Sequence, residues 1–156
     1  ADPGQFYLKS SETETDYIGF PVADFIGGQF WKKYNTRTFV FSDGLSILKT
    51  KTNDYNGYVK LGYLLWQLLN DIGVPFNLNM VTDIQHVGAS GQGGILPEQI
   101  RVYAPDFVSN LANPTKYDLL MALLTYFGFQ IWQEKGEWWI VQRNIRDNAP
   151  TLYKRT

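Results

Sequence analysis

Residues 115–143 read TKYDLLMALLTYFGFQIWQEKGEWWIVQR, and this stretch decides the fold. In its first half, apolar residues recur at three- and four-residue steps, which is the spacing of one helix face. Thr115 and Asp118 have the spacing of a capping box, and Pro114 is expected at the first helical position. Gly128 supplies a stop at the other end. These signals predict an amphipathic helix that leads directly into β-structure.

The second half of the stretch predicts a β-hairpin over residues 129–143. Lys135 and Gly136 separate two aromatic strands, and a glycine suits the positive φ of a two-residue turn. That turn places Trp132 opposite Trp139, and opposed residues share a face. One face then carries Phe129, Ile131, Trp138 and Ile140, and the other carries Trp132, Trp139 and Val141. Since both faces are apolar, the hairpin is either covered on both sides or presents a tryptophan pair to a partner.

A second amphipathic helix is expected upstream. Its apolar face consists of Leu61, Leu64, Leu65, Leu68 and Ile72. Gly73 is expected just after its end, and Pro75 prevents its continuation. Strands are expected after this helix, over residues 76–80, and in the first third of the chain, over residues 37–42. The predicted fold class is α+β: mixed, mostly antiparallel sheets with two packed helices and a C-terminal aromatic β-hairpin.

The chain has 156 residues, enough for one domain or two small ones. Residues 1–4 (Ala-Asp-Pro-Gly) are expected to be a remnant of processing or cloning, and the chain a piece of a longer polypeptide. Residues 5–58 are expected to form a β-rich subdomain, and residues 59–156 a helix–strand subdomain that ends in the aromatic hairpin. One continuous domain is the alternative.

Composition argues against several function classes. The chain has no cysteine, and its 14 Lys+Arg against 15 Asp+Glu give no basic footprint for nucleic acid. No apolar run approaches the ~20 residues of a membrane span, so no membrane anchor is expected. His86 is the lone imidazole, and the glycine-rich residues 88–94 lack the Lys-Ser/Thr of a phosphate loop. We therefore expect no enzyme, and no catalytic, cofactor-binding or metal-binding residues.

The unusual feature of the composition is its aromatic content of 16%. Aromatic side chains serve cores and interfaces alike. Trp66 lies in the leucine-rich helix and is expected in the core. The candidate interface residues are Trp31, Trp132, Trp138 and Trp139, and for the hairpin tryptophans the sequence favours core and interface equally. Stacking of these rings on a sugar is the alternative use.

Four segments resemble, in the same order, segments of the hub-like tail-tip proteins of long-tailed phages and prophages. Residues 17–24, YIGFPVAD, are similar to a strand of the form W-x-G-y-x-x-x-D, with Tyr in place of the usual Trp. Residues 39–49, FVFSDGLSILK, are similar to a segment that contains DGL-x-x-L-K. Residues 62–73, GYLLWQLLNDIG, resemble the first helix of those proteins, and residues 117–141 resemble their helix with a Q-x-x-G-x-W-x-I strand pair.

The resemblance implies a structural role rather than a chemical one. It implies a hub domain that closes the end of the tail tube and assembles around its axis, often as a trimer, with neighbouring tail proteins as further partners. The expected location is the virion, after assembly in the cytoplasm of a host bacterium. Tailocins and contractile injection systems use similar hubs, so the resemblance does not separate these from phages. A carbohydrate- or receptor-binding module that uses exposed tryptophans is the alternative function.

Overall fold

The computed structural model describes residues 6–9, 16–21, 41–84, 95–145 and 150–156. Trp31, His86, the glycine-rich residues 88–94 and most of the strand expected over 37–42 lie outside the described residues. The described elements run in the order β1 (Phe6–Lys9), β2 (Asp16–Pro21), β3 (Phe41–Ser42), η2 (Leu45–Thr50), β4 (Tyr58–Lys60), α1 (Leu61–Asn70), β5 (Asn77–Thr82), β6 (Arg101–Tyr103), η3 (Ala104–Phe107), α2 (Lys116–Phe127), β7 (Phe129–Glu134), β8 (Glu137–Gln142) and β9 (Thr151–Arg155).

A four-stranded sheet, in the order β7-β8-β5-β9, forms the largest β-structure among the described residues. Strands β7 and β8 are the expected hairpin, and Trp132 lies opposite Trp139 as predicted. Strand β5 pairs with β8 in parallel and with β9 antiparallel. The smaller sheets, β1-β2-β3 and β4-β6, are antiparallel. The predicted α+β class with mixed, mostly antiparallel sheets is confirmed.

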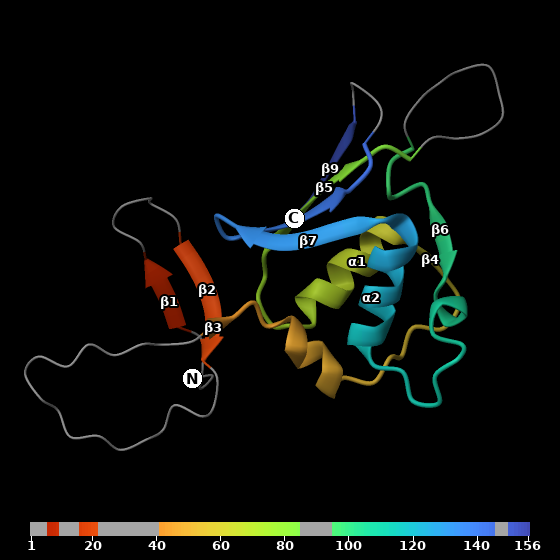
Figure 1. Ribbon diagram of the computed structural model, residues 1–156, viewed down its shortest axis with the longest axis horizontal. Helices are drawn as coiled ribbons and strands as arrows, with labels where there is room; N and C mark the ends of the chain where they lie inside the picture. Colours follow the sequence, from red (N-terminus) through yellow and green to blue (C-terminus); the bar gives the residue numbers. More distant parts are fainter. Residues whose placement is uncertain (1–5, 10–15, 22–40, 85–94, 146–149) are drawn as a thin grey trace, which may run out of the picture.

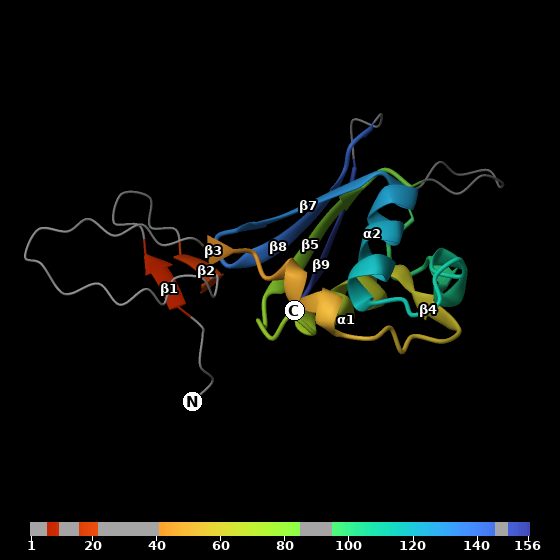
Figure 2. The same ribbon diagram turned by 60° about the horizontal axis from the view of Figure 1, so that its bottom comes forward.

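Helices α1 and α2 lie on the same side of the four-stranded sheet (Figures 1 and 2). Their leucines pack against the sheet residues that point toward them, including Leu78, Met80, Trp138 and Ile140, in one hydrophobic core. Leu48, from η2, belongs to the same core. Each fully buried leucine or methionine side chain stabilises the fold by about 1.5–3 kcal/mol relative to an exposed one. We call this covered side of the sheet the inner face and the opposite side the outer face.

The capping box at the start of α2 is confirmed. The Thr115 Oγ1 accepts a hydrogen bond from the Asp118 backbone N–H at 3.2 Å, and the Asp118 carboxylate accepts one from the Thr115 N–H at 2.8 Å. The expectation that Pro114 occupies the first helical position is wrong, because Thr115 is the N-cap and Lys116 begins the helix. Pro114 instead precedes the cap, and its carbonyl accepts a hydrogen bond from the Asn53 N–H at 2.9 Å.

The two helices end differently. Gly128 follows α2 directly with φ of 66°, the left-handed conformation expected of a terminating glycine. Helix α1 ends at Asn70, earlier than its apolar pattern predicts. Ile72 remains buried from the turn that follows, and Gly73, at φ of 94°, donates its N–H to the Asn70 carbonyl at 2.9 Å. Gly73 therefore closes this turn instead of following the helix directly.

Candidate interaction surface

The two faces of the β7–β8 hairpin have different surroundings. Phe129, Trp138 and Ile140 point to the inner face and are buried in the core. Trp132 and Trp139 point to the outer face, where Trp132 is 38% exposed and Trp139 is half-buried. Of the two arrangements expected from the sequence, the structure therefore has one covered face and one face that presents the tryptophan pair.

The register of the strands shows which other residues share the outer face. Val141 and Val81 lie opposite each other on β8 and β5, and Leu152 lies opposite Val81 on β9. Leu152 is 64% exposed, and the two valines are half-buried. Together with the tryptophan pair, these side chains form an apolar band that crosses all four strands. We define the outer-face band as Trp132, Trp139, Val141, Val81 and Leu152.

Polar side chains border the outer-face band near the hairpin turn. The Glu137 carboxylate accepts hydrogen bonds from the Asn79 amide at 2.7 Å and the Asn77 amide at 3.2 Å, and it forms a 2.7 Å ion pair with Lys154. The hydrogen bond from Lys154, followed by those from the two amides, lowers the pKa of Glu137. A carboxylate held ionised by three donors crosslinks β5, β8 and β9 and is a poor general acid.

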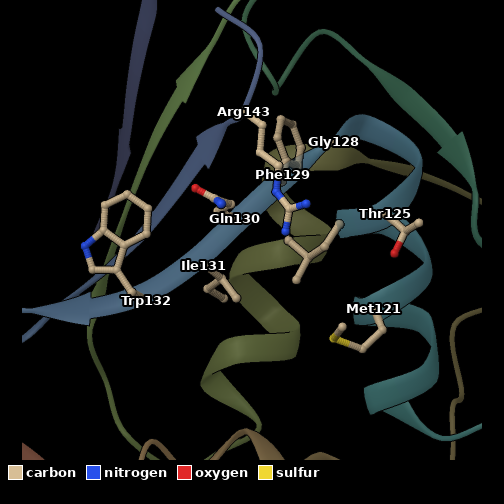
Figure 3. Close-up of a pocket in the computed structure, with 9 residues that line it drawn as sticks. Met121, Thr125, Gly128, Phe129, Gln130, Ile131, Trp132 and Arg143 are labelled. Carbon is tan, nitrogen blue, oxygen red and sulfur yellow. The ribbon is translucent and has the colours of Figure 1, made fainter.

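A groove lies beside the outer edge of β7, between that strand and α2 (Figure 3). Its volume is about 480 Å³. The lining includes Met121 and Thr125 from α2, Ile131 and Trp132 from β7, and Arg143 just after β8. Met121 and Arg143 are exposed, and Arg143 forms no ion pair within the described part of the chain. The groove therefore has a mixed lining, with the apolar Met121 and Ile131 beside the polar Thr125, and it carries the positive charge of Arg143 at one end.

The structure separates the four tryptophans that the sequence grouped as interface candidates. Trp132 and Trp139 lie together on the outer face. Trp138 is 1% exposed and packs in the core against Phe76, so we remove it from the interface. Its position follows from strand alternation, because its neighbour Trp139 points the other way. Trp31 lies outside the described residues.

Several charged side chains elsewhere in the described structure form ion pairs with one another. Glu98 binds Arg155 at 2.6 Å, and the Arg155 guanidinium lies 4.8 Å from the centroid of the half-buried Trp66 ring. Lys116 pairs with Asp71 at 2.8 Å and with Asp54 at 2.9 Å. Within the described ranges, no three His, Cys, Asp or Glu side chains gather as metal ligands would. None of the described helices combines the length and apolar character of a membrane span.

Sequence reasoning found the tryptophan pair but missed the groove and the contribution of β9 to the outer face. The pair follows from a local turn signal, whereas the groove exists because β7 is a sheet edge, which depends on long-range pairing. The β-forming residues Thr151 and Tyr153, which follow Pro150, are a weak signal that could have indicated β9. Searches against protein-family models, curated proteins and solved structures returned no match for this chain.

Proposed function

We propose that this chain is a non-enzymatic structural component of a phage or phage-like tail tip or baseplate hub. In this role it associates with copies of itself and with neighbouring tail proteins at the end of the tail tube, within the virion. The observation that carries the proposal is the outer-face band, which leaves Trp132 and Leu152 exposed on a rigid sheet. Protein interfaces are enriched in tryptophan and tyrosine and depleted in charge at their centres. The ordered resemblance of four sequence segments to hub proteins supplies the biological setting.

The physical case concerns where the exposed apolar groups lie. Scattered exposed hydrophobic residues are ordinary on soluble proteins, but a contiguous patch rimmed by polar groups marks an interaction site. The outer-face band is contiguous across β7, β8, β5 and β9, and the Glu137 cluster rims it. Where a tryptophan is a hot spot at the centre of such a contact, its truncation costs about 2 kcal/mol or more of binding free energy. The band therefore suits a permanent contact between protein subunits.

Sedimentation velocity of the chain over a range of concentrations tests this proposal. We expect self-association, and we expect Trp132→Lys to weaken it by about 30-fold, the equivalent of about 2 kcal/mol. Tyr58→Lys is the matched control, because Tyr58 is also exposed but lies on β4, in a different sheet. A chain that stays monomeric at every concentration, or that is equally affected by both substitutions, would contradict the proposal.

A carbohydrate- or receptor-binding module is the second candidate, and the exposed indole ring of Trp132 beside polar side chains favours it. Sugar recognition also needs free hydrogen-bonding groups next to the stacking ring. Asn79 is buried, and its amide already donates to Glu137 at 2.7 Å, so it offers little to a sugar hydroxyl. Binding to a glycan array that Trp132→Ala or Trp139→Ala abolishes would favour this second function over the first.

A further inference from the structure

Among the described strands, β7 is an edge of the four-stranded sheet, and its backbone offers a regular row of hydrogen-bonding groups. The Arg143 N–H donates to the Gly128 carbonyl at 2.9 Å, so this opposed pair is a hydrogen-bonded pair of the hairpin ladder. Hydrogen-bonded and non-hydrogen-bonded pairs alternate along an antiparallel ladder. The N–H and C=O groups of Phe129, Ile131 and Gln133 therefore point away from β8, and those of Phe129 and Ile131 lie beside the groove. The Gln133 side chain donates to the Asp43 carbonyl at 2.9 Å.

We propose that two copies of this chain pair through β7, antiparallel, about a two-fold axis at Ile131. In that register Ile131 lies opposite Ile131 of the second copy, and Phe129 lies opposite Gln133. Each of the three residues whose backbone groups point outward then lies opposite another such residue, so their N–H and C=O groups can form a continuous hydrogen-bond ladder along the strand. The result is one sheet of eight strands, with the helices of both copies on the same side. Addition of a strand to an open edge is a common mode of protein association.

Charge complementarity selects this register and this partner. The axis at Ile131 places Glu134 of the second copy opposite Gly128, and Arg143 lies on the far side of Gly128 in the same row. Glycine has no side chain, so the arginine and glutamate can meet above it on the outer face. The two-fold axis repeats this ion pair at the other end of the contact. A register shifted by one residue would direct the partner's Glu134 to the inner face and lose both pairs.

The same pairing accounts for the groove. The second copy's β7 would occupy the space beside Met121 and Thr125, which line the groove from α2. It would also place Trp132 opposite Gln130 of the other copy on the outer face, extending the outer-face band from one copy into the other. An exposed edge left without such a cover is an aggregation hazard. The pairing does not depend on a place in a tail, and it leaves the outer face free for the contacts proposed above.

Cysteine crosslinking tests the register directly, because the chain has no cysteine of its own. In Ile131→Cys, the two thiols would sit in a hydrogen-bonded pair with Cα atoms about 5.5 Å apart, within disulfide range. Air oxidation with copper–phenanthroline, in which dioxygen takes up two electrons and the two thiol protons, should give a dimer of twice the 17.9 kDa chain mass. Gln133→Cys is the matched control on the same strand and face, and its thiols would be about 13 Å apart in this register.

A charge exchange gives a second test that changes only exposed side chains. Arg143→Glu should weaken the dimer about tenfold, since it replaces two ion pairs with two repulsive contacts. Glu134→Arg should do the same, and the double variant should restore wild-type association, measured by sedimentation equilibrium. Disulfide formation at both positions or at Gln133→Cys alone would overturn the pairing. So would failure of Ile131→Cys to crosslink, or a double variant no better than the single ones.

Discussion

Replacing Trp138 with alanine should lower the free energy of unfolding by about 3–5 kcal/mol, the usual cost of removing a large aromatic ring from a core. The side chain is 1% exposed, and its ring meets Phe76 edge-on with centroids 6.4 Å apart. The same replacement at Trp132, which is 38% exposed on the other face of the hairpin, should cost about 1 kcal/mol, mainly its cross-strand contact with Trp139. The loss at Trp138 is a large fraction of the 5–15 kcal/mol that holds a typical domain together.

Urea denaturation followed by far-UV circular dichroism is the appropriate measurement, because tryptophan fluorescence would change with the substitution itself. The Trp138→Ala melting temperature should fall by about 6–20 °C, using about 2–4 °C per kcal/mol for a chain of this size. Trp138→Phe should cost much less than alanine, since it also removes a buried Nε1–H that has no hydrogen-bond partner among the described residues. Equal penalties at Trp138 and Trp132 would refute the assignment of these two residues to opposite faces.

The cap and the ion pairs of α2 give two further predictions. Thr115→Ala should cost about 1 kcal/mol by thermal denaturation at neutral pH, with Thr115→Ser close to wild type. Hydrogen bonds from Thr115 lower the pKa of Asp118, so the contribution of the cap to stability is complete above about pH 4. It declines as the pH falls through the lower folded pKa of Asp118. A Thr115→Ala penalty that grows on acidification would contradict this account. Asp71→Asn should lower the free energy of unfolding in urea by about 1–2 kcal/mol, and Asp54→Asn should lower it by less than about 0.5 kcal/mol. Both carboxylates pair with Lys116, but the Asp54 side chain is 74% exposed. A larger loss for Asp54→Asn than for Asp71→Asn would refute this account.

The accurate part of the sequence prediction is the part that local chemistry controls. The two-residue turn at Lys135 and Gly136 sets the hairpin register by itself, and the spacing of Thr115 and Asp118 identifies the cap. Pro114 lies two positions before the first helical residue, Lys116, instead of at that position, because the cap is made by Thr115 between them. Each of these features involves residues that lie close together in the sequence, so their energetics can be read without the rest of the fold.

The inaccurate or missing part depends on long-range pairing. Strand β5 pairs in parallel with β8, about 60 residues later in the chain, and nothing within either strand specifies that partner. Strand β9 has three polar residues among its five and becomes a strand because β5 offers it an edge. The groove beside β7 follows from this strand order, since β7 is left at the edge only when β5 pairs with β8. The tryptophans were therefore identified as candidates, but their separation into core and surface was not.

The position of Trp132 needs an explanation beyond folding. Trp138 is buried because alternation directs it toward the leucines of α1 and α2, and the core needs its volume. Trp132 gains no comparable burial, and its indole N–H has only a 3.4 Å contact with Glu134 among the described residues. A polar residue at Trp132 would keep the hairpin at a cost of about 1 kcal/mol, since its neighbours on the same face of β7, Gln130 and Glu134, are polar. The fold therefore accounts for Trp138, and the intermolecular contact proposed above would account for the exposure of Trp132.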